Sequence, residues 1–433
     1  MDWKEEYRKK IRTADEAVKI VKDGDIVHIG TASCIAYELA EALYRRKKEL
    51  HGVRISSAVN LKLLPFYTDE KNDSFSVFTY FAGPAEREAL QHGNCRYSSL
   101  HLSRVDQWCR DFLSGGVAFL EVSPPDENGC MSYGTYTAMH DDVRAACSRV
   151  VLQVNQNAPY VYGRKNLIHV SQADYIVEAD SPLAVVPDAP VDETLKKISS
   201  YIVEQIPDGA TIQLGLGGLS GAVGYGLENK NDLGVHSEML TNSMMKLMQK
   251  GVINNRKKNF NPGRAVVGFA LGSPELYAFA DHNPNLMFTP FTYVNDPAMI
   301  AQNDHFISVN TAMSIDLFGQ VAADNIGGRQ ISAIGGQVDF VRGAQMSKGG
   351  KSFIAMTAAL ENKKGRSSRI VPVLPPGTAV TTGRADVQYV VTEYGCVNLK
   401  KLDNSDRAKA LIELAHPAFR EQLRDQAKEL HLL

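Results

Sequence analysis

A glutamate at the end of an apolar segment is the residue in this sequence best suited to covalent chemistry. Glu238 lies in GVHSEMLTN, Gly234–Asn242. A short segment of helix length separates this motif from the glycine-rich turn Gly215–Gly221 that precedes it. A carboxylate at a strand end, facing backbone amides with little side-chain bulk around them, can attack a carbonyl carbon. The alternative is a solvated glutamate beside a loop, and the nonapeptide alone favours that alternative.

A first glycine-rich loop could supply backbone amides to a negatively charged group. It consists of Gly215, Leu216, Gly217 and Gly218, after a predicted strand and before a predicted helix that begins at Leu219. Amides at a helix N-terminus suit an anion or a developing oxyanion. The alternative is a tight strand-to-helix turn, because the loop lacks the Lys-Ser/Thr of a P-loop and the acidic residue that a dinucleotide fingerprint prefers.

A second glycine-rich loop changes the balance between these interpretations. Gly335 and Gly336 open the segment GGQVDF, and Arg342 follows it. Taken alone, this segment could be a strand bend with a structural Asp-Arg pair. Two glycine loops and one glutamate in the same half of the sequence, all at predicted strand ends, favour a functional site.

Three further features are candidates for supporting roles. Glu393, at the end of a predicted strand in VVTEYG, competes with Glu238 for the role of nucleophile. Asn295 opens Asn-Asp-Pro, which is a turn by composition. A basic run is usually solvated surface, but one run is the best local candidate for binding a phosphate. Its members are Lys363, Lys364, Arg366 and Arg369.

Composition limits the partners that the protein can have. The 433 residues are 44% hydrophobic and 22% charged, with a formal net charge of -2, so bulk charge favours neither nucleic acid nor a membrane surface. The six cysteines are scattered without a C-x-x-C pair, which suggests reduced thiols in a cytoplasmic protein and no metal site. We expect no signal peptide, and no run approaches the ~20 apolar residues of a membrane span.

An internal duplication organises the elements that must position these groups. A predicted helix, an Asp-Gly turn, a strand and a glycine occur in order near the N-terminus and again after Tyr201. The turn glycines Gly24 and Gly209 are 185 positions apart, as are the glycines that follow the strands, Gly30 and Gly215. This constant offset indicates two related α/β halves.

A looser match extends the duplication, because Tyr175 in DYIVE and Tyr389 in QYVVTE are 214 positions apart. We infer two similar open α/β domains, residues 1–185 and 190–433, joined near the proline-containing segment Ser181–Asp192. Short apolar runs that alternate with helical ones predict mostly parallel sheets covered on both faces. Ligands of such sheets bind at the carboxyl ends of strands, so we expect the site in the cleft between the halves, with most catalytic groups from the second.

Several motifs together resemble the acetyl-CoA hydrolase/transferase family, and within it the 4-hydroxybutyrate CoA-transferase group. The resemblance runs from MDWK at the N-terminus to the AHP-F segment near Ala415. The motifs, in order, are GLGG at 215–218, HSEM at 236–239, VNDP at 294–297, GGQVDFVRGA at 335–344 and VVTEYG at 390–395. One departure is Asn242-Ser243, where relatives usually have Asp-Gly, and it leaves the substrate open.

The resemblance implies a two-domain CoA-transferase fold, shared with certain sugar-phosphate isomerases, and a role for each motif. Glu238 would be the nucleophile, the loop from Gly215 to Leu219 would contact CoA, and Gly336 would support the oxyanion. Asn295 would border the active site and Glu393 would support it. Lys364, or its neighbour Lys363, would approach CoA.

The expected activity is CoA transfer between short-chain carboxylic acids of the acetate, butyrate and 4-hydroxybutyrate class, through a glutamyl-CoA thioester. Coenzyme A and acyl-CoA would be substrates, with no tightly bound cofactor and no metal, and relatives commonly form homodimers or higher homo-oligomers. The carboxylate would already be ionised at pH 7. An acyl-CoA hydrolase is the main alternative, followed by a sugar-phosphate isomerase and a non-catalytic CoA-binding protein.

Overall fold

The chain folds into two compact units, each built around its own sheet. The computed structural model describes residues 2–69, 73–215, 217–363 and 365–433. One unit consists of Met1–Pro187 with Val266–Val294, and the other of Asp188–Ala265 with Asn295–Leu433. None of the described helices is long and apolar enough to cross a membrane.

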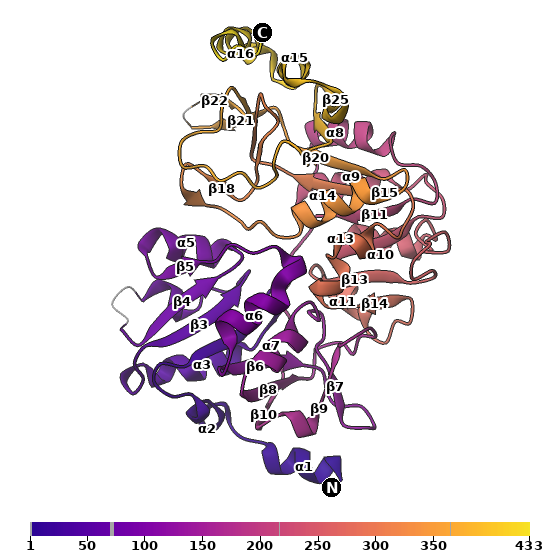
Figure 1. Cartoon of the computed structure of the whole chain (residues 1–433). Coiled ribbons are helices and arrows are strands. Elements are labelled where there is room, and N and C mark those ends of the chain that lie inside the picture. Colours follow the sequence, from indigo (N-terminus) through magenta and orange to yellow (C-terminus); the bar gives the residue numbers. More distant parts are fainter. Residues whose placement is uncertain (1, 70–72, 216, 364) are drawn as a thin grey trace. The chain divides into compact units, whose positions relative to one another are not determined.

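Unit 1 contains a parallel sheet with the strand order β10-β8-β6-β1-β3-β4-β5, to which the short antiparallel β2 is added (Figure 1). Its strands are β1 (Ile26–Thr31), β2 (Cys34–Ile35), β3 (Val53–Ala58), β4 (Phe75–Thr79), β5 (Cys95–Tyr97), β6 (Val117–Val122), β8 (Arg149–Asn155) and β10 (Tyr175–Ala179). A separate hairpin is formed by β7 (Cys130–Ser132) and β9 (Leu167–His169). The segment from the middle of the chain adds β13 (Ala265–Ala270), α11 (Pro274–Ala280), β14 (Leu286–Phe288) and α12 (Phe291–Val294).

Helices cover both faces of this sheet, as the sequence predicts. On β1, Val27 and Ile29 join the apolar core beneath α3, whereas the intervening His28 faces His140 of α7. The period of two along a strand explains this division between faces. The helices of unit 1 include α1 (Trp3–Lys10), α2 (Ala14–Ala17), α3 (Tyr37–Arg45), α4 (Pro65–Thr68), α5 (Pro84–His92), α6 (Val105–Leu113) and α7 (His140–Ala146).

Unit 2 has a matching sheet in which β12, β11, β15, β20 and β24 follow one another in parallel, and β25 pairs antiparallel with β24. These strands are β11 (Thr211–Leu214), β12 (Gly234–Leu240), β15 (Phe306–Thr311), β20 (Lys351–Ala355), β24 (Tyr389–Thr392) and β25 (Gly395–Asn398). Its helices include α8 (Glu193–Val203), α9 (Gly218–Gly226), α10 (Asn242–Gln249), α13 (Pro297–Ile300), α14 (Gln337–Met346), α15 (Asn404–Leu414) and α16 (Pro417–Glu429).

Short strands of unit 2 lie outside this sheet. They form a sheet with the order β17-β16-β23 and two hairpins, β18–β19 and β21–β22. Their bounds are β16 (Ser314–Asp316), β17 (Val321–Ala322), β18 (Asn325–Ile326), β19 (Arg329–Gln330), β21 (Ala359–Asn362), β22 (Gly365–Ser368) and β23 (Ile370–Val371).

The strand orders of the two units repeat, which supports the internal duplication read from the sequence. The order β3-β1-β6-β8-β10 in unit 1 corresponds to β12-β11-β15-β20-β24 in unit 2. The Asp-Gly turns also agree in detail: Gly24 and Gly209 both have φ +75°, and the preceding Asp23 and Asp208 accept a backbone N–H from His51 and Asn231. Both turns therefore use the same local hydrogen bond to start the first strand of a sheet.

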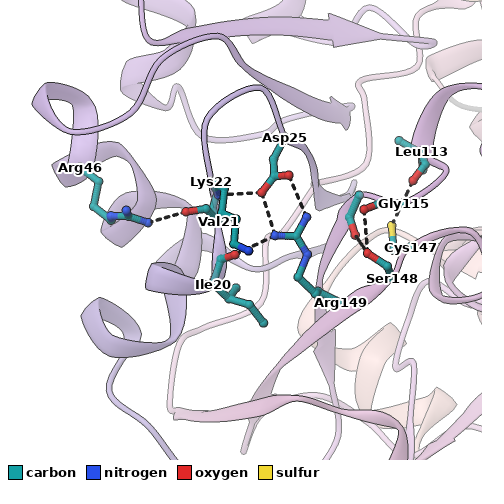
Figure 2. A network of polar contacts seen from close by, with 11 residues as sticks. Ile20, Val21, Lys22, Asp25, Arg46, Leu113, Gly115, Cys147, Ser148 and Arg149 are labelled. Atoms are coloured by element: carbon teal, nitrogen blue, oxygen red, sulfur yellow. Dashed lines mark hydrogen bonds and ion pairs between the residues drawn. The ribbon is translucent and has the colours of Figure 1, made fainter.

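A charged pair ties the start of β1 to the start of β8 in unit 1, although β6 lies between these strands (Figure 2). Arg149 donates two hydrogen bonds to the Asp25 carboxylate, at 2.9 and 2.8 Å, and a third to the Ile20 carbonyl at 2.8 Å. Asp25 also accepts the backbone N–H of Lys22. The two charged side chains are only 21% and 15% exposed, so each compensates for the desolvation of the other.

We expect Arg149→Met to lower the free energy of unfolding by about 2 kcal/mol, because Asp25 then remains mostly buried without its cation. The matched control is Arg45→Met, which removes the exposed pair with Asp15 and should cost under about 1 kcal/mol. Urea denaturation of both variants measures the difference. Equal losses in the two variants would contradict a structural role for the Asp25–Arg149 pair.

Candidate active site

The strand β12 delivers Glu238 to the carboxyl end of the unit 2 sheet. Glu238 is the fifth residue of β12 and the only one in this strand that is not buried. The strand ends two residues later, where the Thr241 hydroxyl accepts the backbone N–H of Met244 and caps α10. The N-cap fixes where the chain leaves the sheet and so limits how far Glu238 can move.

Two groups from other segments of unit 2 hold the Glu238 carboxylate. The side-chain amide of Asn295 donates a hydrogen bond to Oε2 at 2.9 Å, and the backbone N–H of Gly336 donates another. Asn295 is fully buried and directly precedes Asp296, the N-cap of α13. The sequence interpretation of Asn295 as more than a turn residue therefore has a geometric basis.

The surroundings of Glu238 disfavour its charge. Burial raises the pKa of Glu238 to about 7, and the negative charge of Asp339 adds to this rise, while the hydrogen bonds from Asn295 and Gly336 oppose it. Part of the residue surface still meets solvent. The carboxyl group is thus desolvated but remains within reach of a ligand. Because burial outweighs the two donors, the pKa of Glu238 lies above that of an ordinary glutamate, and ionisation at pH 7 is less complete than the sequence led us to expect.

Gly336 leaves no room for a side chain at this point. A Cβ atom there would lie 2.2 Å from Asn295 Nδ2 and 2.2 Å from Glu238 Oε2. Gly336 has an ordinary φ of −93° as the N-cap of α14, so close approach, and not backbone strain, explains the glycine. Gly335 before it has φ +60°, in the region that favours glycine. The second glycine loop is therefore the entry to a helix and not a strand bend.

Gln337 anchors this turn on both sides. Its Nε2 donates to the Thr311 carbonyl at the end of β15, at 2.9 Å, and its Oε1 accepts the Thr382 hydroxyl at 2.8 Å. Arg342, farther along α14, pairs with Asp386. The structural Asp-Arg pair considered for this segment is not formed between Asp339 and Arg342 among the described contacts, because Arg342 pairs with Asp386. Gln337 was not predicted as a site residue, although it lies inside the GGQVDF motif, which was the available signal.

The first glycine loop lies at the same end of the sheet as Glu238. Ile212 of β11 is paired with Val235 of β12. Gly215 and Glu238 each lie three residues after this pair, toward the carboxyl ends of their strands. Gly217 has φ +101° and is the N-cap of α9, which begins at Gly218 and buries Leu219. Leu216, one of the loop residues whose amides could meet an oxyanion, lies outside the described residues. CoA contact by this loop stays a prediction.

Comparison with known proteins identifies the family. The model of the acetyl-CoA hydrolase/transferase N-terminal domain matches residues 1–187, and that of the C-terminal domain matches residues 272–427. The chain belongs to the acetyl-CoA hydrolase/transferase family. The resemblance seen in the motifs is thereby confirmed, and so is an α/β fold with mostly parallel sheets in two domains.

Relatives of the chain in this family include named enzymes. It is 39% identical to the 4-hydroxybutyrate coenzyme A transferase of Clostridium kluyveri over 99% of this chain and 100% of that protein. It is 37% identical to the butyryl-CoA:acetate CoA-transferase of Anaerostipes caccae over 100% and 99%. The crystal structure of 4-hydroxybutyrate CoA-transferase from Porphyromonas gingivalis superposes with a TM-score of 0.81 at 34% identity, covering 99% of this chain and 100% of that one.

More distant relatives carry a different activity in their names. One is the acetyl-CoA hydrolase of Candida albicans, which is 22% identical over 97% of this chain and 89% of that protein.

Glu393 and the basic run lie elsewhere in unit 2. Glu393 is in the turn between β24 and β25, and its carboxylate accepts the backbone N–H of Ala358 at 2.8 Å. No contact among the described residues joins Glu393 to Glu238, so the structure does not bring the two nucleophile candidates together. Lys364 lies outside the described residues, and Lys363 is exposed in the turn of the β21–β22 hairpin.

The departure from the family pattern lies in α10 and not at the carboxylate. Asn242 donates a hydrogen bond to Asp188 at 2.8 Å, and Ser243 packs against Gly224 of α9, where a Cβ would come within 2.3 Å of the Ser243 hydroxyl. Ser243 therefore acts in helix packing, and Asn242 contacts the segment that precedes α8. Among the described residues, no group of three or more His, Cys, Asp or Glu side chains is placed to hold a metal ion.

We expect Gly336→Ala to reduce acyl-CoA turnover by roughly 100-fold or more, because the new methyl group displaces the Glu238 carboxylate and Asn295 from their hydrogen-bonding positions. The matched control is Gly221→Ala in α9, where a Cβ meets no atom within 4 Å. Steady-state kinetics, with thermal unfolding to show that both variants fold, make the measurement. Activity in Gly336→Ala equal to that of the control would contradict the assigned geometry.

Proposed function

We propose that the protein transfers CoA between short-chain carboxylic acids and that Glu238 carries the coenzyme as a thioester during the reaction. The observation that carries this proposal is the Glu238 carboxylate itself, partly exposed at a strand end and held by Asn295 and the Gly336 amide. Among the described residues, no Lys or Arg forms a salt bridge with it. Transfer between two acids requires a group that can hold CoA at similar energy, and a carboxylate does this.

The first half of the reaction moves CoA onto the protein. A Glu238 oxygen bonds to the acyl carbon, the carbon–sulfur bond breaks, and CoA departs as a thiolate to leave a mixed anhydride. The thiolate sulfur then bonds to the Glu238 side-chain carbonyl carbon. The bond from that carbon to the bridging oxygen breaks, and the first acid leaves as a carboxylate. No proton is gained or lost, so the sequence needs no separate general base.

The second half reverses these steps with the acceptor acid. Its carboxylate attacks the glutamyl thioester, CoA thiolate leaves, and the thiolate then attacks the acyl carbon of the new anhydride to release acyl-CoA and Glu238. Each attack creates an oxyanion, and we assign the Gly336 N–H at the start of α14, which donates to the Glu238 carboxylate, to stabilise it. A single such donor contributes roughly 3 kcal/mol in comparable sites. The Asn295 amide supplies a second donor next to it.

The substrate class follows from the relatives, whose names include 4-hydroxybutyrate, butyryl-CoA and acetate. We propose acids of this size, with acyl-CoA hydrolysis as the alternative because distant relatives are named acetyl-CoA hydrolases. Coenzyme A is then a substrate, and we propose no resident cofactor. A cytoplasmic location and a homodimer or higher homo-oligomer also stay predictions.

We expect incubation with acyl-CoA alone, followed by borohydride, to inactivate the protein, because borohydride reduces the glutamyl-CoA thioester. Mass spectrometry should locate the CoA adduct before reduction, and the reduced side chain after it, at Glu238. Glu238→Gln should form no adduct and should lose transfer activity. Full activity after borohydride treatment, or transfer by the Gln variant, would refute the mechanism.

A labelled acceptor separates transfer from hydrolysis. The protein is incubated with one acyl-CoA and a second, isotopically labelled short-chain acid, and both new acyl-CoA and free thiol are measured. Appearance of the labelled acyl group on CoA supports transfer. Free thiol without labelled acyl-CoA favours the hydrolase instead.

We expect kcat/KM for acyl-CoA to fall about tenfold per pH unit below pH 7 and to level off above it, because the nucleophile must be ionised and its pKa is raised to about 7. Asn295→Ala should move the acidic limb of this profile, the part where kcat/KM falls, to higher pH, because it removes a donor that lowers the pKa of Glu238. Asp339→Asn should move it to lower pH, since it removes a negative charge. Shifts in one direction for both variants would contradict the assignment of the limb to Glu238.

The same pKa change affects stability with a defined sign. A carboxyl group whose pKa is higher in the folded state destabilises that state as pH rises from the unfolded pKa through the folded one. Glu238→Gln should therefore gain stability over the parent protein between about pH 4.5 and 7, and keep that gain above pH 7. Below pH 4.5 the two proteins should have similar stability.

A further inference from the structure

The structure separates the members of the basic run between β21 and β23. Arg366 is exposed on β22 and forms an ion pair with Glu361 across the hairpin, and Lys363 is exposed in its turn. Arg369 differs from both. It lies between β22 and β23, beyond the hairpin drawn in orange in Figure 1, and is only partly exposed.

The Arg369 guanidinium has no counterion within the described part of the chain. Its Nε atom is buried without a hydrogen-bond partner, and no hydrogen bond or ion pair connects the rest of the group to a described residue. Other arginines with mostly buried side chains do have such partners. Each of the following is paired with a carboxylate: Arg46, Arg144, Arg149 and Arg420.

The backbone around Arg369 is fixed on both sides. Its N–H donates to the Ala358 carbonyl at 2.9 Å, and its carbonyl accepts from the Ile315 N–H at 3.0 Å and the Ser314 hydroxyl at 2.8 Å. Ala358 follows the carboxyl end of β20 and donates its own N–H to Glu393. Arg369 is therefore held at the strand-end edge of the unit 2 sheet, where ligands of parallel sheets bind.

Burial of an unpaired cation is unfavourable, and the surroundings show this for Arg369. Desolvation lowers the pKa of Arg369, and the nearby negative charge of Glu393 only partly opposes the change. The Glu393 carboxylate accepts the Ala358 N–H, and among the described contacts no hydrogen bond joins it to Arg369. A protein retains such a group at a cost unless an anion completes its hydrogen bonds.

We propose that Arg369 binds an oxyanion of the substrates, either a phosphate of CoA or the carboxylate of the exchanged acid. This inference builds on the proposed function, because that reaction brings both kinds of anion to unit 2. The guanidinium presents paired N–H donors that match a phosphate or a carboxylate in two parallel hydrogen bonds. A chain with a formal net charge of -2 needs such a local receptor, because its overall charge attracts no polyanion.

The test compares Arg369→Met and Arg369→Lys with Arg424→Met, which removes an exposed arginine that pairs with Glu413 in the same unit. We measure KM for acyl-CoA, for the acyl-pantetheine thioester that lacks all phosphates, and for the acceptor acid. Arg369→Met should raise one of these constants by roughly 10- to 100-fold, the effect of losing a charged hydrogen bond. Arg369→Lys should recover part of the loss, and Arg424→Met should change none of them.

The pattern of KM values identifies the anion. A rise for acyl-CoA but not for acyl-pantetheine assigns a phosphate, and a rise for the acceptor acid with both thioesters unchanged assigns the carboxylate. If no KM changes and Arg369→Met unfolds at a higher temperature than the parent protein, Arg369 is only an unpaired buried charge and the proposal is overturned. Should Arg369→Met fail to fold, Arg369→Lys alone decides between these outcomes.

Direct binding keeps this test independent of the catalytic mechanism. Calorimetric titration of CoA, and separately of the acid, into the Glu238→Gln background measures affinity without turnover. Loss of CoA or acid affinity in Arg369→Met supports the anion site even if Glu238 proves not to carry CoA. Unchanged affinity for both ligands removes the anion site and leaves the Glu238 mechanism standing.

Discussion

The rest of unit 2 depends on how one carboxylate is held between desolvation and hydrogen bonding. Burial pushes Glu238 toward its neutral form, and two donors, the Asn295 amide and the Gly336 N–H, pull it back toward the anion. The balance leaves a pKa of about 7, where both forms are populated. A more exposed carboxylate would be a weaker nucleophile, and a more deeply buried one would seldom be ionised. The β12 strand, the α14 turn and the α13 cap all serve this balance by fixing the three groups in place.

The duplicated architecture provides the same strand-end position in both units, but only unit 2 has a glutamate there. Because Ile26 pairs with Arg54 in unit 1 as Thr211 pairs with Gly234 in unit 2, the position equivalent to Glu238 is Ala58. Ala58 is fully buried, as a parallel-sheet strand with both faces covered requires. The two sheets therefore share the strand order and the Asp-Gly turn but not the reactive group. The fold provides an equivalent strand end in each unit, and the residue at that position determines whether the strand end can carry out chemistry.

Much of this arrangement could be predicted from the sequence because it depends on local periodicity and spacing. The constant offset between Gly24 and Gly209 reports a repeated turn, and alternating short apolar runs report parallel sheets. Glu238 and Gly336 were singled out from their places near predicted strand ends, whereas their roles came from the family resemblance and stay predictions. Local patterns work where the physical cause is local, as in an Asp-Gly turn or a capped helix.

Other features depend on tertiary contacts that no local pattern encodes. The raised pKa of Glu238 comes from burial and from Asp339, about 100 residues later in the chain. The distinction between Arg366 and Arg369, three positions apart, arises because Glu361 lies across the hairpin from Arg366, whereas no carboxylate in the described part of the chain pairs with Arg369. Gln337 likewise acquires its role from Thr311 and Thr382, which approach it only in the folded chain.

The near-neutral titration of Glu238 has a consequence beyond its own reactivity. Loss of the ionised form as the pH falls through neutrality would slow attack by this carboxylate without any separate inhibitor site. The desolvation that raises the pKa of Glu238 thus also makes its ionised fraction sensitive to small changes of pH near neutrality.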